Sequence, residues 1–191
     1  MGPILDWSEL EKICSGCTKC RLAGTRHNVV IGRGSRTASV MFVGEGPGEQ
    51  EDLTGQPFVG AAGQLLDKYL DAAGISMDEA YIANIVKCRP PENRNPRDDE
   101  EEACIDYLRA QVRFIRPKLI ACLGKVAASK LMKPDYPIVK EHGIMMKKGS
   151  FSMIALYHPA AILRDPSKKE DMYRDMKKIR QFLDGLTKGG N

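Results

Sequence analysis

Five cysteines have a spacing that could bind a metal. Cys17 and Cys20 form a Cys-x-x-Cys pair, and Cys14 could replace Cys17 on spacing alone. Cys88 and Cys104 lie far downstream, beside polar sequence rather than in apolar runs. Four thiolates suit either a tetrahedral zinc ion or an iron–sulfur cluster, and the spacing does not choose between them. Since free cysteines are often buried, simple core packing is the alternative.

A glycine-rich loop with several carboxylates follows the apolar run 40–43. Residues 44–52 are called the glycine–acid loop below; its glycines and acids are Gly44, Glu45, Gly46, Gly48, Glu49, Glu51 and Asp52. The loop lacks the Lys and Ser/Thr of a phosphate-binding P-loop, and its carboxylates would repel phosphate. Its glycines let backbone approach a ligand closely, and because the loop is rich in acids, it is predicted to face a neutral or cationic group. A solvated turn with ordinary surface acids is the alternative.

Three further residues carry groups that suit a flat, polar ligand. His158 directly follows the apolar run 153–156, and Asn84 lies near the end of another such run. An imidazole can donate a hydrogen bond or exchange a proton, and an amide offers one acceptor and two donors. Phe58 could stack its ring on a planar group. The set predicts a pocket for a polar heterocycle, although His158 could be structural and Phe58 a core anchor.

Alternating strand and helix patterns supply the framework for these residues. The expected strands are 39–43, 81–86, 119–123 and 153–156, and the expected helices are 4–14, 61–73, 98–115, 124–132 and one after residue 165. Loops are expected at 54–60, 89–97 and 160–164, and irregular structure or a hairpin at 135–150. This order predicts an α/β fold, a three-layer α/β/α sandwich around a four-stranded parallel sheet. Because ligands bind at the carboxyl ends of parallel strands, we expect the polar groups above to share one crevice.

Composition sets the outer limits. The chain has 191 residues, of which 42% are hydrophobic, and this is enough for one core and a single domain over 1–191. No long apolar run predicts a membrane span, no secretory signal is visible, and a cytoplasmic location is expected. In that compartment six cysteines argue against a disulfide framework, and Cys122, inside an apolar run, is predicted to be core. The net charge of +4 is too weak alone to argue for nucleic acid.

Four motifs together resemble the family 4 uracil-DNA glycosylases, the iron–sulfur enzymes of bacteria and archaea. They are the glycine–acid loop 44–52 and the segments 55–60, 84–91 and 158–164, and the likeness runs from about Cys17 to the last helix. The resemblance implies a uracil-DNA glycosylase-like fold and a DNA repair hydrolase. Such an enzyme flips uracil out of DNA, cleaves its N-glycosidic bond and leaves an abasic site. The alternative is a non-catalytic or covalent uracil-DNA-binding relative, but the basic, His-containing insertion of that relative has no counterpart in 89–102.

The resemblance also implies a role for each site residue. A 4Fe–4S cluster is expected on Cys17, Cys20, Cys88 and Cys104, which makes 1–38 a cluster-binding N-terminal segment. Phe58 is expected to stack on uracil, Asn84 to read its polar edge, and His158 to hydrogen-bond its O2. The tail 187–191 is expected to fray.

Around the sugar the resemblance is less specific. Gly44, Glu45 and Gly46 are expected to line the pocket, with Glu45 also a catalytic candidate, and Glu51 either places the attacking water or closes the pocket against the thymine methyl. Better-known relatives have an Asp where this chain has Gly46, so electrostatic stabilisation should supply most of the rate. In 160–164, Ile162 or Leu163 is expected to fill the vacated stack and Arg164 to bind phosphate. A monomer that releases free uracil is expected, and contact with a replication clamp is left open.

Overall fold

A six-stranded sheet forms the centre of the computed structural model, which describes residues 4–188. The strands are β1 (Arg33–Gly34), β2 (Val40–Gly44), β3 (Ala80–Asn84), β4 (Leu119–Leu123), β5 (Met145–Lys148) and β6 (Phe151–Leu156), in the order β1-β3-β2-β4-β6-β5. The four central strands are parallel, as predicted. The predicted hairpin at 135–150 is present only in part, because β5 lies in this range but its partner β6 follows it. The sequence did not predict β1 or the antiparallel edges.

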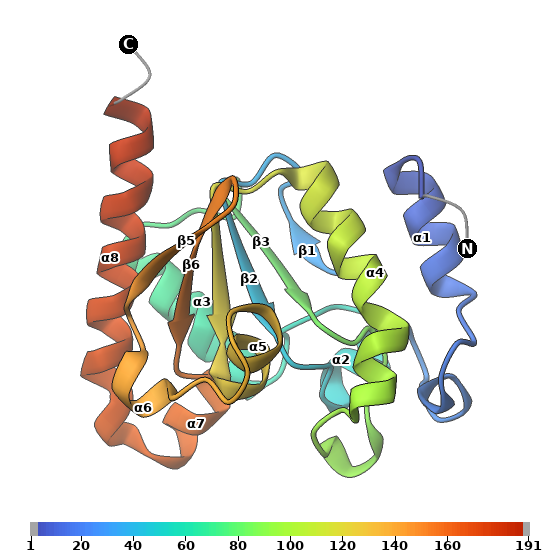
Figure 1. Cartoon of the computed structure of the whole chain (residues 1–191). Helices are drawn as coiled ribbons and strands as arrows, with labels where there is room; N and C mark the ends of the chain where they lie inside the picture. The colour runs from blue at the N-terminus through green and yellow to red at the C-terminus, as the bar shows by residue number, and fades with distance from the viewer. Residues whose placement is uncertain (1–3, 189–191) are drawn as a thin grey trace.

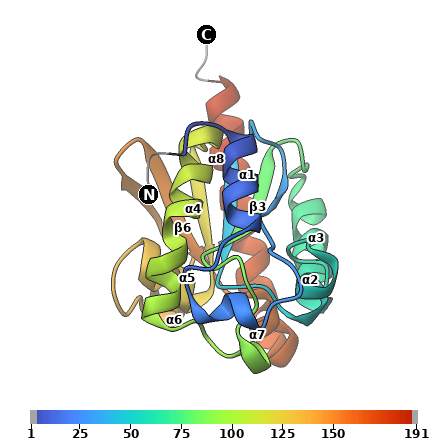
Figure 2. The ribbon, with the colours of Figure 1, turned by 90° about the vertical axis from the view of Figure 1, so that its right-hand side faces the viewer.

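Helices cover both faces of the sheet (Figures 1 and 2). They are α1 (Trp7–Ser15), α2 (Glu49–Thr54), α3 (Ala61–Ala73), α4 (Asp98–Ile115), α5 (Gly124–Leu131), α6 (Ile138–Glu141), α7 (Pro159–Arg164) and α8 (Lys169–Lys188), with 3₁₀ turns at Arg21–Gly24, Pro91–Asn93 and Pro166–Lys168. One core contains side chains of α1, α4 and α5, and a second contains side chains of α3, α7 and α8. The α/β/α prediction is confirmed. Strands β2, β3 and β4 are buried along their whole length, which explains their continuous apolar sequence.

Two segments predicted as loops are short helices. In α2 the acidic first turn suits the helix dipole, and Gly55, at a φ of 73°, ends the helix in the left-handed region. In α7, Pro159 occupies the first helical position and His158 is the N-cap. These helix-start and helix-end signals are local features of the sequence. The two loop predictions were wrong because they did not take them into account.

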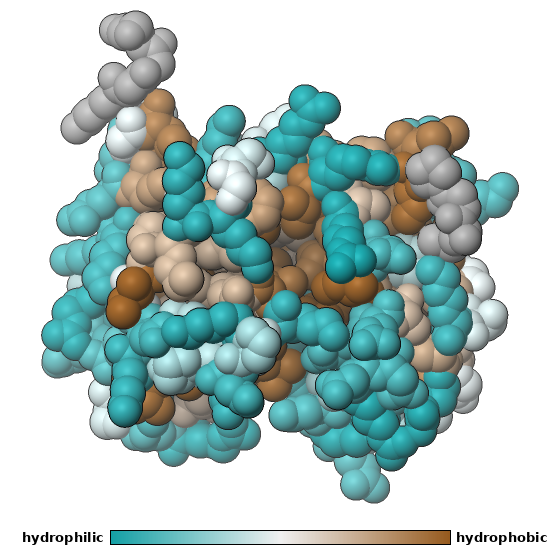
Figure 3. Space-filling model, in the orientation of Figure 1, coloured by the Kyte–Doolittle hydropathy of each residue, from teal (hydrophilic) through white to brown (hydrophobic). Residues whose placement is uncertain are grey.

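The layer formed by α4 and α5 is incomplete. A groove of about 720 Å³ lies between α4, α5 and the β5–β6 hairpin, and its floor includes Leu108, Ile120 and Met153. Figure 3 shows apolar surface at this place between charged side chains. None of the helices within 4–188 has the length and apolar content that a membrane span requires. Residues 187 and 188 belong to α8, and the rest of the predicted frayed tail lies outside the described residues.

Candidate active site and cysteine centre

A cavity of about 630 Å³ lies at the carboxyl ends of the four parallel strands. Each strand reaches its wall at its end or just beyond: Glu45 follows β2, Asn84 ends β3, Leu123 ends β4 and His158 follows β6. β3 and β4 flank β2 on opposite sides, so the cavity lies where the strand order reverses, the usual ligand position in such sheets. The structure thus brings together the polar residues that the sequence placed at strand ends.

Gly44 packs directly against Asn84 and Phe58. A Cβ atom on Gly44 would come within 2.4 Å of Asn84 Oδ1 and 2.7 Å of Phe58 Cζ, so only glycine fits there. Asn84 Oδ1 is buried and accepts no hydrogen bond from the described part of the chain. A buried polar atom without a partner costs free energy, so this oxygen is suited to accept an N–H from a ligand.

Phe58 is held in an unusual backbone conformation. Its φ of 54° lies in the left-handed region, where aromatic residues are rare. Gly63 of α3 makes this possible, because a Cβ there would lie 1.8 Å from the Phe58 carbonyl oxygen. From the other side Arg33 Nε donates to the Pro57 carbonyl at 3.1 Å. The ring is therefore fixed at the cavity wall, with its centre 5.8 Å from that of His158.

His158 presents a neutral imidazole to the cavity. Its Nδ1 accepts a hydrogen bond from Ala160 N at 3.1 Å, which leaves the proton of the neutral ring on Nε2. Burial lowers the pKa of His158 to about 4, and the positive charge of Arg164 acts in the same direction, while Glu51 opposes both. At neutral pH the ring is therefore an uncharged N–H donor.

Glu51 holds the glycine–acid loop to the segment that carries Phe58. Its Oε1 accepts from Val59 N at 2.9 Å and Gly60 N at 2.8 Å, and its Oε2 accepts from Gly48 N at 3.1 Å. Three backbone donors stabilise the charged carboxylate and occupy much of its accepting capacity. Glu51 lines the cavity, but its contacts are those of a residue that fixes two loops.

The other acids of this loop have separate surroundings. Buried Asp52 faces away and accepts from the backbone N–H groups of His27 and Asn28, while exposed Glu49 lies 3.5 Å from Arg89. Glu45 is partly buried in the cavity wall, where burial and the charge of Glu101 raise its pKa to about 7. Sequence proximity therefore did not imply a shared function for these carboxylates.

The segment after β6 corrects one prediction. Ile162 is fully buried in the core beneath α7 and cannot fill a gap in DNA from that position. Leu163, the next residue of the helix, is 50% exposed, and Arg164 lines the cavity. The loop prediction could not distinguish buried Ile162 from exposed Leu163. In a helix, successive residues point to different faces.

The cavity has further wall residues that the sequence analysis did not single out. Asn93, Arg94 and Asn95 line it from the loop after β3, and Lys125 lines it from the start of α5. Arg94 is fixed by a bidentate ion pair with buried Glu100, at 2.7 and 2.8 Å. These residues follow the ends of strands, and this position could have identified them as candidates for the cavity wall.

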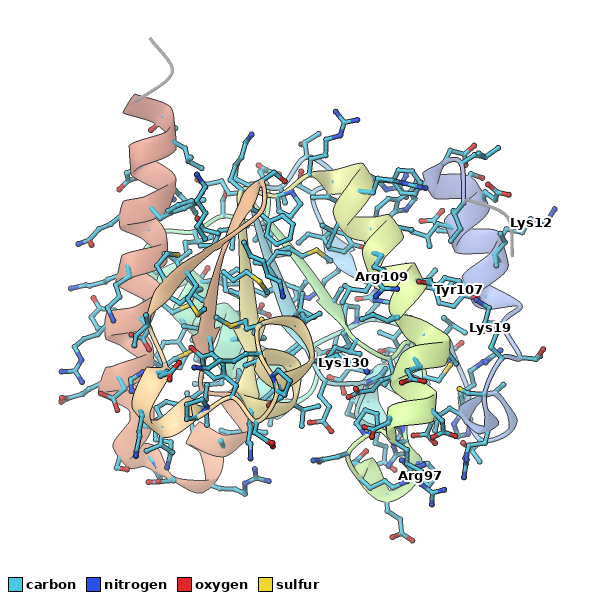
Figure 4. The ribbon with its side chains drawn as sticks, in the orientation of Figure 1. Lys12, Lys19, Arg97, Tyr107, Arg109 and Lys130 are labelled. Atoms are coloured by element: carbon cyan, nitrogen blue, oxygen red, sulfur yellow. The ribbon has the colours of Figure 1, made fainter. Side chains whose placement is uncertain are left out.

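Five cysteines line a second, much smaller cavity between the N-terminal segment and α4. They are Cys14, Cys17, Cys20, Cys88 and Cys104. In residues 4–188 no three Cys, His, Asp or Glu side chains are arranged to hold a single metal ion, so these thiols surround a space instead of converging on a point. Tyr107 also lines the space, and the Lys19 Nζ lies 4.7 Å from the centre of its ring (Figure 4). Cys122 is buried in β4, away from this group, as predicted.

Nitrogen donors approach two of these sulfur atoms. Arg26 Nη1 donates to Cys88 Sγ at 3.4 Å, and Lys87 N donates to Cys104 Sγ at 3.2 Å. Burial raises the pKa of Cys104 to about 11, and the nearby Lys87 ammonium acts in the opposite direction. Buried thiols that receive N–H and cationic donors are suited to bind a metal group as thiolates.

Known proteins share most of this chain. The model of the uracil DNA glycosylase superfamily matches residues 31–183. A type-4 uracil-DNA glycosylase of Archaeoglobus fulgidus is 43% identical over 87% of this chain and 87% of its own length. Type-4 enzymes of Sulfurisphaera tokodaii and Thermotoga maritima are 43% and 42% identical, over 91% and 87% of this chain and 84% and 89% of their own lengths. The chain belongs to the type-4 uracil-DNA glycosylase family. The resemblance in the four motifs is therefore confirmed over nearly the whole sequence.

Proposed function

We propose that this protein is a uracil-DNA glycosylase of base excision repair, which hydrolyses the N-glycosidic bond of uracil in DNA and leaves an abasic site. One observation carries the proposal: the unpaired Asn84 Oδ1, the neutral His158 and the fixed Phe58 ring meet in one cavity. An amide acceptor, an N–H donor and an aromatic face match the imide edge and the ring of uracil.

The chemistry follows from these groups. Uracil leaves as an anion, so an N–H donor at its O2 stabilises the transition state more than the ground state. His158 provides that donor without first losing a charge, because its imidazole is already neutral. The sugar becomes positively charged, and an ionised Glu45 can stabilise it or accept a proton from water. Gly46 supplies no carboxylate.

Glu51 has a positioning role in this proposal. Its three backbone hydrogen bonds hold the loops that present Gly44 and Phe58, and they leave little capacity for activating a water molecule. At the DNA surface, Leu163 fills the gap left by the flipped nucleotide and Arg164 contacts phosphate. Uracil-containing DNA is the substrate in this proposal, and free uracil is a product. The proposed enzyme acts as a monomer in the cytoplasm.

Cys17, Cys20, Cys88 and Cys104 hold a 4Fe–4S cluster in this proposal, and Cys14 borders the same space. Five thiols line one space, and four thiolates are the usual ligands of such a cluster. The cluster stabilises the junction between the N-terminal segment 1–38 and the loop after β3, within a single domain. Anaerobically purified protein should be brown and absorb near 400 nm.

A strand-cleavage assay tests the enzyme against the uracil-binding alternative. Incubation with a uracil-containing oligonucleotide should give alkali-labile abasic sites over several turnovers. A heat-resistant protein–DNA adduct, or binding without release of uracil, would contradict the hydrolase. The absence of histidine in 89–102 favours turnover.

A further inference from the structure

Lys87 lies between the cysteine centre and the uracil cavity and is almost completely buried, with 1% of its surface exposed. Its Nζ donates to the Asn84 carbonyl oxygen and to Gln111 Oε1, each at 2.7 Å. Its backbone N–H donates to Cys104 Sγ, and the residue is part of the wall of the cysteine cavity. One residue therefore contacts both centres.

The buried ammonium lacks an anionic partner. Both of its side-chain acceptors are neutral oxygens, and no carboxylate within residues 4–188 forms an ion pair with it. A buried charge is normally paired, because its removal from water is costly. The adjoining cavity carries five thiols, and a cluster bound by four thiolates is negatively charged. The missing counter-charge of Lys87 is thus supplied at the place where the cluster would bind.

The backbone around Lys87 belongs to the uracil cavity. Ile85 N donates to the Gly44 carbonyl at 2.9 Å, and Val86 N donates to the Glu45 carbonyl at 3.1 Å. Segment 84–88 therefore begins at the base-reading amide, is bonded to the glycine–acid loop, and ends at a cluster ligand. Within this segment the Lys87 side chain folds back and fixes the carbonyl of Asn84.

We propose that Lys87 is a positioning residue that couples the two centres. Its ammonium balances the charge of the thiolate-bound cluster, and the same group holds Asn84 in the orientation that reads uracil. The inference rests on the proposed function, since it gives Asn84 and the cluster the roles stated there. It assigns a second purpose to the cluster site, namely to keep a buried cation beneath the uracil pocket.

A double-mutant cycle tests the coupling. Single-turnover excision is measured for the wild type, Lys87→Met, Asn84→Ala and the double variant. Lys87→Met should slow excision by about 10- to 100-fold, the loss expected for a buried charge-assisted hydrogen bond. In the Asn84→Ala background the same change should have an effect below about 2-fold, because a residue that acts through Asn84 has nothing left to position. Equal effects in both backgrounds would overturn the inference.

Iron retention gives a readout without catalysis. Under anaerobic conditions Lys87→Met should release iron to a chelator about 10-fold faster than the wild type, since a charge that favours the cluster is lost. Lys148→Met is the matched control: the Lys148 Nζ also donates to a backbone carbonyl, that of Leu131 at 2.7 Å, but far from both centres. The control should match the wild type in both assays. Iron release from Lys87→Met at the wild-type rate would contradict the charge-balancing role.

The outcomes separate the two proposals. If Lys87→Met does not fold, Gln111→Leu can replace it, because this change removes one acceptor of the ammonium. Gln111→Leu should give a smaller change in the same direction in both assays. No change in either assay would overturn the inference. If the wild type excises uracil but the cycle is additive, the coupling alone fails. If the wild type releases no uracil, the proposed function fails, and the chelator assay still decides the role of Lys87 toward the cluster.

Discussion

The cysteine centre and the uracil cavity lie on either side of one short segment, 84–88, yet they present different hydrogen-bond donors. At the cysteine centre the Arg26 guanidinium and the backbone N–H of Lys87 donate to sulfur atoms around an enclosed space. In the wider uracil cavity the imidazole is neutral, and Glu51 is tied to backbone N–H groups. The cysteine centre therefore directs N–H donors at sulfur atoms, whereas the imidazole donor in the uracil cavity is uncharged.

Loss of the neutral donor should have the largest effect. His158→Ala should reduce uracil excision by about 100- to 1000-fold, the usual cost of removing a preorganised donor to a developing anion. His27→Ala is the control, because His27 contacts Asp52 outside the cavity. Single-turnover rates and iron content of both variants provide the measurement. A fall below 10-fold, or a loss of iron with His158→Ala, would break the separation between the centres.

Removal of a thiol from the cysteine centre should first reduce the iron content of the protein. Cys88→Ala should lose most of its iron, from about four atoms per chain, whereas Cys122→Ala should keep it, because Cys122 lies in the core of β4. Iron and sulfide analysis of anaerobic preparations measures this difference. Equal iron in both variants would place the cluster elsewhere.

The two neighbouring residues of α7 should separate stability from catalysis. Ile162→Ala should lower the free energy of unfolding by about 2–5 kcal/mol, since it empties a fully buried site. Leu163→Ala should leave stability within about 0.5 kcal/mol and slow excision from duplex DNA, because its side chain is half exposed and is proposed to contact DNA. Denaturant unfolding and duplex assays test the pair. The reverse pattern would restore Ile162 as the wedge.

Glu51→Gln should lower the free energy of unfolding by about 1–3 kcal/mol. The new side-chain amide N–H would face a backbone N–H, and that backbone donor would then have no acceptor. The matched change Glu49→Gln, at an exposed site, should alter stability little. Thermal and denaturant unfolding measure both. If Glu51→Gln abolished excision without any loss of stability, Glu51 would belong to the chemistry.

Glu45 should determine a modest pH dependence. Its folded pKa of about 7 lies above the unfolded value of 4.5, so the folded protein keeps a proton that the unfolded chain releases. The contribution of Glu45 to stability should therefore fall as the pH rises from 4.5 to 7, and excision should rise toward pH 7 as the carboxylate ionises. Glu45→Gln should remove both slopes. An unchanged rate profile in Glu45→Gln would exclude Glu45 from catalysis.

The sequence predicted the parallel core and the shared edge of Asn84 and His158 because apolar runs and strand ends are local signals. Asn84 and His158 were found in this way, since each lies at the end of a buried run. Edge strand β1 was missed because it is two residues long and is defined by its partner β3.

Other features depend on contacts between distant residues. Glu51 could not be recognised as the link between two loops, because its donors Val59 and Gly60 lie beyond an intervening turn. Lys87 appears in the sequence as an ordinary charged residue beside a cysteine. Only the fold shows that it is buried against Asn84 and Gln111.

The most direct test of this contrast is the charge state of His158. Nitrogen NMR of the histidine rings, assigned with His158→Ala, should show His158 as the neutral Nε2–H form from pH 8 down to pH 5, with protonation only near pH 4. Because the folded pKa lies below 6.5, the contribution of His158 to stability should also fall as the pH drops from 6.5 to 4, so the wild type should lose stability relative to His158→Ala over this range. A His158 ring that titrates near pH 6.5, or carries its proton on Nδ1, would contradict a neutral donor in the uracil cavity.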